Sequence, residues 1–319
     1  MVCAVLEIST VDYHTGGEPF RIVAGQALRG DTILEKRRDA QARLDDIRRL
    51  LVNEPRGHAD MYGCFVTEPE DEGADLGVVF FHNAGYSTAC GHGTIALVTW
   101  ALESGVLPVA GEETRVVVDV PSGRLETFAR VRGSDVVSVR FRNVPSFIWG
   151  TNVVPGVDVA FGGAFYASVE ERVEPGELPR LIARGRELKR ELEREHDIVH
   201  HLEPELRDVY GVIFWQREGE RVQRNVTVFA DGEVDRSPCG SGTSARLALL
   251  DASGELPRGE ELRHLSIVGS KFRAWVVGDA DVAGRAAVVT EVEGSAHRTG
   301  EHRFVLEDAD ELGTGFLLR

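Results

Sequence analysis

The chain has 319 residues, a formal net charge of −16, and 42% hydrophobic and 28% charged residues. This composition supplies a sizeable core and excludes collagen-like, disordered and coiled-coil proteins. An acidic surface repels phosphate backbones, so nucleic acid is not expected as a partner, whereas a small anionic substrate can still meet a local site of opposite charge. No apolar run approaches the roughly 18 residues of a membrane span, so no membrane association is expected. At about 150 residues per domain, the length favours two domains.

The cysteine content and the first residues indicate a reducing compartment. Four cysteines, Cys3, Cys64, Cys90 and Cys239, are too few and too scattered for a disulfide framework, and no CxxC pair suggests a zinc site. The first ten residues show no positive region followed by an apolar block, so no signal peptide is predicted. We therefore expect a cytoplasmic protein with free thiols and no bound metal.

Short strands and one long helical segment are predicted in the first half of the chain. The range 8–12 is extended in pattern, and the turn-rich range 14–19 leads into a further extended run at 20–23. The range 31–53 has helical spacing of its Ile and Leu residues and ends before Pro55. Further strands are predicted at 63–66, 76–81, 115–120 and 136–141.

The second half begins with a charged helical stretch and returns to strands. Within 170–208, an apolar helical face is formed by Leu178, Leu181, Ile182, Leu188 and Leu192. The surrounding charge is interpreted as the solvated face of this helix, not as a binding surface. Strands are predicted at 209–215 and 225–230. Such a mixture of short strands and a few helices predicts an α/β or α+β fold.

An internal repeat relates the two halves of the chain. Cys-Gly-His-Gly-Thr at 90–94 matches Cys-Gly-Ser-Gly-Thr at 239–243, and Ser-Gly-Val-Leu-Pro at 104–108 matches Ser-Gly-Glu-Leu-Pro at 253–257. Both copies keep the same internal spacing. This agreement indicates a duplicated half-domain and two halves related by a pseudo-two-fold axis.

Each copy predicts a buried central helix with a cysteine at its N-terminus. The residues after each glycine-rich turn are apolar on nearly all faces, which is typical of a helix inside the core. Gly105 and Gly254 are placed to end these helices in the left-handed conformation. Because the helix dipole and the free N–H groups favour thiolate, we expect the pKa of Cys90 and of Cys239 to lie below about 8.5.

Two such cysteines on opposite sides of one cleft suit a proton-transfer reaction. The glycines expose the N–H groups of both first helical turns, which together form a cradle for a carboxylate. One sulfur, as thiolate, can remove the α-proton from one face, while the other, as thiol, returns a proton to the opposite face. The N–H donors stabilise the charge that develops on the carboxylate. The hypothesis is a two-base inversion of a carbon centre.

Other interpretations explain less of the pattern. A lone buried cysteine is usually a small hydrophobe, which is how we interpret Cys3 and Cys64. A cysteine protease needs one cysteine and leaves the second copy unexplained. A binding module that lost its chemistry would not need both thiols. The turn at 14–18 either lines the site or is simply a tight bend.

Four segments carry a family resemblance: Val-Asp-Tyr-His-Thr-Gly-Gly-Glu-Pro at 11–19, Gly-His-Ala-Asp-Met-Tyr-Gly at 57–63, the range 83–94, and Asp-Arg-Ser-Pro-Cys-Gly at 235–240. They resemble the proline racemase superfamily, which contains proline racemases, 4-hydroxyproline 2-epimerases and trans-3-hydroxy-L-proline dehydratases. The last segment is highly specific and disfavours a diaminopimelate epimerase proper. The resemblance implies a diaminopimelate-epimerase-like fold with two pseudo-symmetric lobes, each a sheet wrapped around a central helix. It also implies a cofactor-independent enzyme with a small-molecule substrate, often a homodimer.

The resemblance implies a site in the cleft between the lobes. The two acid/base thiols would be Cys90 and Cys239. The substrate carboxylate would be held by the backbone amides of Gly91, His92, Gly240 and Ser241. The ring nitrogen of the substrate would meet His92 and Asp235. The pocket around the ring would be lined by Tyr62, Ser87 and Phe229.

We expect the two halves of the chain to form the two lobes. Residues 1–140 are predicted to form an N-terminal lobe that carries Cys90, with residues 300–319 as a candidate C-terminal addition to it. Residues 141–299 are predicted to form a C-terminal lobe that carries Cys239. The cleft between these lobes would then contain both thiols.

Within the superfamily, inversion and dehydration are the competing activities. Both cysteines are present, as in the racemases and epimerases, whereas typical 3-hydroxyproline dehydratases have Thr at the second position. The segments 61–63, 85–88 and 162–167 look more like the dehydratase branch, and the hydroxyls of Tyr62 and Ser87 suit a hydroxylated ring. Because Cys239 supplies the second proton donor, we predict a proline racemase or hydroxyproline 2-epimerase. A trans-3-hydroxy-L-proline dehydratase, or an enzyme with both activities, is the alternative.

Overall fold

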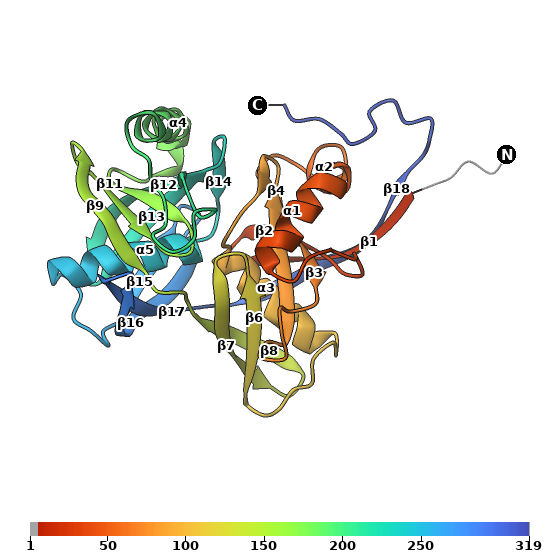
Figure 1. The fold of residues 1–319 in the computed structure, drawn as a ribbon, viewed down its shortest axis with the longest axis horizontal. Coiled ribbons are helices and arrows are strands. Elements are labelled where there is room, and N and C mark those ends of the chain that lie inside the picture. Colours follow the sequence, from red (N-terminus) through yellow and green to blue (C-terminus); the bar gives the residue numbers. More distant parts are fainter. Residues whose placement is uncertain (1–5, 319) are drawn as a thin grey trace.

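The computed structural model describes residues 6–318, so Cys3, which was expected to be structural, lies outside the described residues. Figure 1 shows two lobes, each made of strands around one central helix. The strands of the first lobe are β1 Leu6–Thr15, β2 Glu18–Val23, β3 Tyr62–Thr67, β4 Leu76–His82, β5 Gly85–Tyr86, β6 Glu113–Val120, β7 Gly123–Arg132, β8 Asp135–Arg142 and β18 Ala296–Leu306. The strands of the second lobe are β9 Phe147–Val154, β10 Val157–Phe161, β11 Phe165–Glu170, β12 Val209–Gly219, β13 Val222–Phe229, β14 Glu233–Asp235, β15 Leu262–Ser266, β16 Lys271–Val282 and β17 Arg285–Gly294.

The two lobes have the same strand order. Hydrogen bonds join the first lobe in the order β18-β1-β2-β3-β4-β6-β7-β8. They join the second lobe in the order β9-β10-β11-β12-β13-β15-β16-β17. In both series the third and fifth pairs are parallel and the others antiparallel, and β8 pairs with β17 to join the lobes. The repeat seen in the sequence is therefore a repeat of the whole lobe, with pseudo-two-fold symmetry.

Each lobe encloses the helix that follows its glycine-rich turn. These helices are α3 Gly91–Glu103 and α5 Gly240–Ser253. α3 is buried from Gly91 to Leu102 and packs against β8, β18 and β1, while α5 packs against β16, β17 and β10. Gly105 and Gly254 have φ of +73° and +71°, so both helices end in the predicted left-handed conformation. A helix that is apolar on all faces has its stable place inside such a sheet.

The other helices cover the outer faces of the sheets (Figure 1). They are α1 Ile33–Arg43, α2 Asp45–Val52, the 3₁₀-helix η1 Pro175–Glu177 and α4 Leu178–Glu195. The helical segment predicted over 31–53 is confirmed, but it forms two helices, because the buried Leu44, at φ −116°, leaves the helical conformation between α1 and α2. The predicted apolar face of α4 is confirmed, since Leu181, Leu188 and Leu192 are buried and α4 packs against β12 and β13.

Every predicted strand overlaps an observed one, with ends that differ by up to four residues, whereas several strands of both lobes were not predicted. The ranges 63–66, 76–81, 115–120 and 136–141 fall inside β3, β4, β6 and β8. Strands β5, β7, β9 to β11 and β14 to β18 were missed, although β7 and β16 do alternate buried and exposed side chains over part of their length. Among residues 6–318, no helix is both long and apolar enough to cross a membrane.

Candidate active site

The two glycine-rich turns meet at the junction of the lobes. Cys90 and Cys239 occupy the N-cap positions of α3 and α5, and only the Cys90 side chain accepts a capping hydrogen bond. A β-carbon built on Gly91 would lie 2.5 Å from the Cα of Gly240, far inside normal contact distance. Glycine at both positions therefore allows the two helix N-termini to touch, and it places both cysteines at one cavity.

That cavity collects nearly all of the residues implied by the resemblance. Its lining comprises Tyr62, Ala89, Cys90, Gly91, His92, Tyr166, Tyr210, Phe229, Asp235, Cys239, Gly240 and Ser241. Ser87 does not line the cavity, but its side chain hydrogen-bonds the hydroxyl of Tyr62 behind the wall. The space left inside is about 10 Å³, room for about one water molecule. Substrate entry therefore requires the walls to move apart.

Sequence reasoning missed two tyrosines of this site. The hydroxyl of Tyr166 lies 2.6 Å from Ser241 Oγ and 3.7 Å from the Cys239 sulfur. Tyr210 lies in β12, and its hydroxyl is 2.9 Å from that of Tyr62 in β3. Tyr166 lies in the dehydratase-like segment 162–167, which was a usable signal. Nothing near Tyr210 in the sequence marks it, since only the pairing of the lobes brings it to Tyr62.

Burial controls the acidity of both thiols. The backbone N–H of Gly93 donates to the Cys90 sulfur at 3.2 Å, as expected at a helix N-terminus. Desolvation nevertheless raises the pKa of Cys90 well above its ordinary value, and that of Cys239 to about 12. The expectation of a lowered thiol pKa is therefore wrong, because loss of water outweighs the helix N-terminus, and the charge of Asp235 adds to the effect. A thiolate formed here is a strong base.

The two turns are not identical, although the repeat predicted the same geometry. Cys90 has an extended backbone at φ −153°, whereas Cys239 has φ +62°, in the left-handed region. A non-glycine residue in that region stores local strain, which is typical of functional sites. The strained turn is stabilised by Ser237, whose hydroxyl accepts a hydrogen bond from the Cys239 N–H at 3.1 Å.

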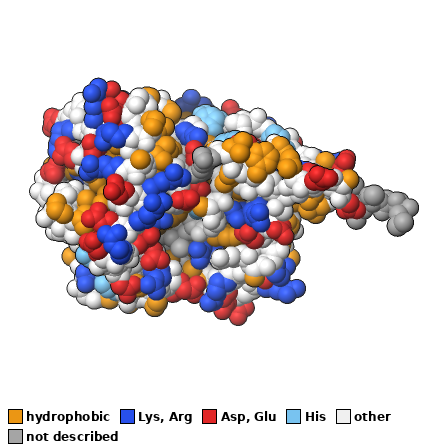
Figure 2. Space-filling model, turned by 90° about the horizontal axis from the view of Figure 1, so that it is seen from above, with side chains coloured by type: hydrophobic (Ala, Val, Ile, Leu, Met, Phe, Trp, Pro, Cys, Tyr) orange, Lys and Arg blue, Asp and Glu red, His pale blue; other side chains and the backbone are white. Residues whose placement is uncertain are grey.

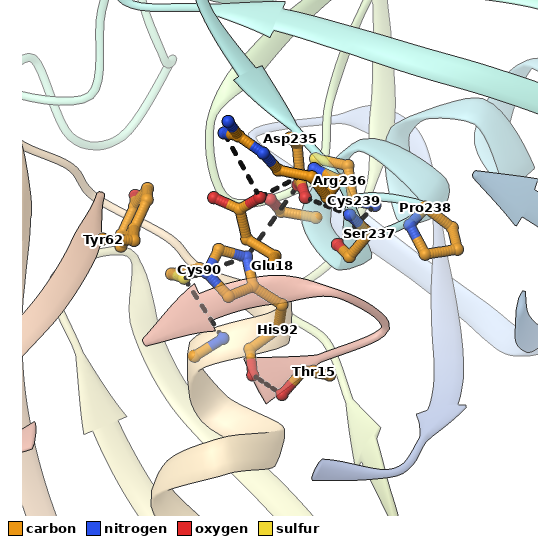
Figure 3. Close-up of polar contacts among 12 residues, drawn as sticks. Thr15, Glu18, Tyr62, Cys90, His92, Asp235, Arg236, Ser237, Pro238 and Cys239 are labelled. Carbon is orange, nitrogen blue, oxygen red and sulfur yellow. Dashed lines mark hydrogen bonds and ion pairs between the residues drawn. The ribbon is translucent and has the colours of Figure 1, made fainter. Parts of the chain in front are cut away.

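His92 and Asp235 form a buried polar pair beside the thiols (Figure 3). His92 Nδ1 lies 3.8 Å from Asp235 Oδ2, and the His92 ring is 3.4 Å from the Cys90 sulfur. Burial lowers the pKa of His92 to about 3, so this ring is neutral near pH 7. Burial also raises the pKa of Asp235 to about 6, while the N–H of Ser237 holds its carboxylate at 2.7 Å. The pair therefore presents one negative charge at neutral pH.

The turn at 14–18 supports the site from behind and does not line the cavity. Thr15 Oγ1 donates to the carbonyl oxygen of His92 at 2.9 Å, and Glu18 Oε2 accepts the N–H of Arg236 at 2.7 Å (Figure 3). A β-carbon on Gly16 would lie 3.4 Å from Ser237 Cβ. This turn thus contacts the loops that precede α3 and α5. Its role, left open by the sequence, is to position these loops.

Lowering the pH should reduce activity through Asp235. As the pH falls through about 6, this carboxylate gains a proton and loses the charge that, as the resemblance implies, would face a substrate ring nitrogen. We therefore expect kcat/KM to fall below pH 6 and to be independent of this group above it, which a pH–rate profile measures. Asp235→Asn should have a low kcat/KM that does not fall further below pH 6. If kcat/KM of the variant still falls below pH 6 as in the wild type, the pH dependence belongs to another group.

No group of three or more His, Cys, Asp or Glu residues within 6–318 is arranged to hold a metal ion. Cys64, the remaining described thiol, is buried in β3 away from the cavity, and burial raises its pKa. Its surroundings fit the structural role expected from the sequence.

A buried helix inside each curved sheet, with the two helix N-termini meeting between the lobes, defines a diaminopimelate-epimerase-like fold. The chain belongs to the proline racemase family, whose sequence model matches residues 10–317. A trans-3-hydroxy-L-proline dehydratase of Bacillus cereus is 44% identical, with 97% of this chain and 98% of that protein covered. A 3-hydroxyproline 2-epimerase of Burkholderia multivorans is 45% identical, with 98% of each covered. The structure of a hydroxyproline epimerase from Agrobacterium vitis with bound trans-4-hydroxy-L-proline has a TM-score of 0.91 at 31% identity, covering 98% of this chain and 96% of that one.

Proposed function

We propose that this protein inverts the α-carbon of a hydroxyproline, and of proline, by proton transfer between Cys90 and Cys239. The observation that carries this proposal is that both sulfurs, from equivalent positions in the two lobes, line one cavity. The epimerases among its relatives support the substrate class, and one of them has a hydroxyproline bound. Inversion needs an acid and a base on opposite faces of the carbon, and two thiols supply both.

The backbone around the thiols suits the substrate carboxylate. Gly91, His92, Gly240 and Ser241, from the first turns of α3 and α5, line the cavity, where a carboxylate would accept hydrogen bonds from their backbone N–H groups. These donors would stabilise the negative charge as the α-proton leaves. The high pKa of each thiol makes its thiolate basic enough for a carbon acid, at the cost of a small thiolate fraction at pH 7.

The opposite end of the cavity suits a ring that carries a hydroxyl. Tyr62, hydrogen-bonded to Ser87 and to Tyr210, offers a hydroxyl cluster within an otherwise aromatic wall that includes Phe229, 5.8 Å from the Tyr62 ring. These hydroxyls are paired with one another, and they can also exchange hydrogen bonds with a ring hydroxyl, which a purely apolar ring does not offer. Asp235 and His92 would meet the ring nitrogen.

A second candidate function is dehydration of trans-3-hydroxy-L-proline. The name of the Bacillus cereus relative favours it, and so does the hydroxyl cluster, which could protonate a departing hydroxide. Dehydration needs one base and leaves the second thiol without a role. For this reason the pair of cysteines supports inversion as the main reaction.

Incubation in heavy water separates the two reactions. L-proline, trans-4-hydroxy-L-proline and trans-3-hydroxy-L-proline are each added, and the products are analysed by NMR and polarimetry. Inversion gives deuterium at the α-carbon and a change of optical rotation. Conversion of the 3-hydroxy substrate alone, to a ketimine-type product without inversion, would replace the first proposal by the second.

Removing the Tyr62 hydroxyl should affect hydroxyproline more than proline. We expect Tyr62→Phe to lower kcat/KM for hydroxyproline by about 3- to 10-fold, the value of one hydrogen bond between uncharged groups, with a smaller change for proline. Tyr13→Phe is the control, because the Tyr13 hydroxyl bonds Glu103 outside the cavity. Equal losses for both substrates would show that Tyr62 does not contact the ring hydroxyl.

A further inference from the structure

A second cavity lies between the lobes, directly outside the hydroxyl cluster. Its volume is about 280 Å³, and it shares Tyr210 with the inner cavity and Ser87 with the cluster behind Tyr62. Its other walls come from α1, from α4 and from the loop before β12. The hydroxyls of Tyr62 and Tyr210 therefore separate the outer cavity from the thiols.

One cation in the wall of the outer cavity has no carboxylate within ion-pair distance among residues 6–318. Arg37 of α1 lines this cavity, and its Nη2 donates to the carbonyl oxygen of Tyr86 at 2.9 Å. Its Nε is buried without a hydrogen-bond acceptor, and no acid within the described chain approaches its side chain within 4 Å. Burial lowers the pKa of Arg37, and the charge of Glu205, which lies beyond ion-pair distance, offsets this only in part. Such a group binds a carboxylate readily, because the ion pair restores what burial removed.

The acidic residues of this cavity are already paired. Glu205 bonds Arg38 at 3.1 Å, Glu193 lies 3.6 Å from Lys189, and Asp208 lies 3.6 Å from Arg207. Lys189 also lines the cavity and donates to a backbone carbonyl. Figure 2 shows the molecule from the side of α4, and Lys and Arg side chains gather near the middle of that face. The lining of this cavity holds three basic and three acidic side chains, so it is close to neutral, in contrast to the net charge of −16 of the whole chain.

We infer that the outer cavity is an entrance subsite, in which Arg37, assisted by Lys189, binds the carboxylate of a small cyclic amino acid before it passes Tyr62 and Tyr210. This inference rests on the proposed function for the identity of the substrate. The inner cavity has no room for a ring until the hydroxyls of Tyr62 and Tyr210 separate. A binding position outside them would hold the substrate until this separation occurs. Once there, the substrate needs only the separation of Tyr62 from Tyr210 to reach the thiols.

The test compares Arg37→Gln with a control variant in the other lobe, Arg190→Gln. Arg190 lies next to Lys189 on the exposed face of α4, does not line the cavity, and loses the same charge. An entrance residue acts on capture, so we expect Arg37→Gln to lower kcat/KM about tenfold while kcat stays within about twofold. Arg37→Lys should recover part of the loss, and Arg190→Gln should change neither value. Unchanged kcat/KM, or an equal fall of kcat and kcat/KM, overturns the inference.

The association rate of pyrrole-2-carboxylate, a planar carboxylate, gives a readout that does not need turnover. Stopped-flow fluorescence should show about tenfold slower association with Arg37→Gln. If the wild-type protein converts no proline-type substrate, the proposed function fails, while this rate still tests the subsite. If Arg37→Gln does not fold, as judged by thermal melting, Arg37→Lys and Lys189→Gln replace it. Wild-type association rates in both of these would overturn the inference.

Discussion

Replacing either Cys90 or Cys239 by serine is expected to lower the rate of inversion by about 10²- to 10⁴-fold, the usual contribution of a general acid or base. A serine hydroxyl fits the same space but is a far weaker acid than a thiol. It cannot form the base that removes the α-proton, and it returns a proton poorly. The measurement is the loss of optical rotation, with α-deuterium incorporation followed separately for each enantiomer.

The pair of variants also distinguishes inversion from dehydration. Inversion uses both thiols in each turnover, so both variants should lose it. Dehydration uses one base, so one of the two variants would keep most of that activity. Cys64→Ala is the control, because it removes a buried thiol outside the cavity and should leave kcat/KM within about twofold of the wild type. Full inversion activity in either serine variant would end the two-base mechanism.

Substitution of Gly91 by alanine is the second change with a large expected effect. The new methyl group would lie 2.5 Å from the Cα of Gly240, about 1 Å too close, and 2.9 Å from the Phe141 ring. Because backbone cannot rotate away as a side chain does, the two helix N-termini must separate. A displacement of about 1 Å at reacting groups can cost about 10²-fold in rate, so we expect a loss of this size in kcat.

The stability of the glycine variant should fall as well, by about 1–3 kcal/mol, the usual cost of overpacking a core. Gly240→Ala should behave similarly, since its β-carbon would lie 2.7 Å from the Cα of Gly91. Gly111→Ala is the matched control, because no atom lies within 4 Å of its added carbon and its φ is not in the left-handed region. Thermal melting and kcat are measured for all three. Wild-type kcat in Gly91→Ala would mean that contact between the helices does not set the geometry of the site.

Local sequence predicted the parts of the site that local structure controls. The repeated Cys-Gly-x-Gly-Thr strings gave two buried helices, a cysteine at the start of each, and a left-handed glycine after each end. These features depend on a few neighbouring residues, so a single sequence is enough to predict them. The break at Leu44 and the φ of Cys239 were missed, because packing from elsewhere in the chain decides both.

The site's chemistry depended on contacts across the lobes. Tyr210 reaches Tyr62, and Arg37 reaches the outer cavity, only because the lobes pack together. The sign of the thiol pKa shifts is a further example. The sequence correctly placed each sulfur at a helix N-terminus, but enclosure by both lobes removed its water and raised its pKa.

The amino-acid sequence by itself determined the duplicated lobe, the two central helices and the identity of the residues that end and begin them. It did so because hydrophobic spacing and glycine placement act over one or two turns of chain. Only the tertiary structure decided that the helices touch at Gly91 and Gly240, which hydroxyls close the cavity, and how basic the thiols become. Those properties depend on which atoms from distant segments exclude water from the site, and no local stretch of sequence contains that information.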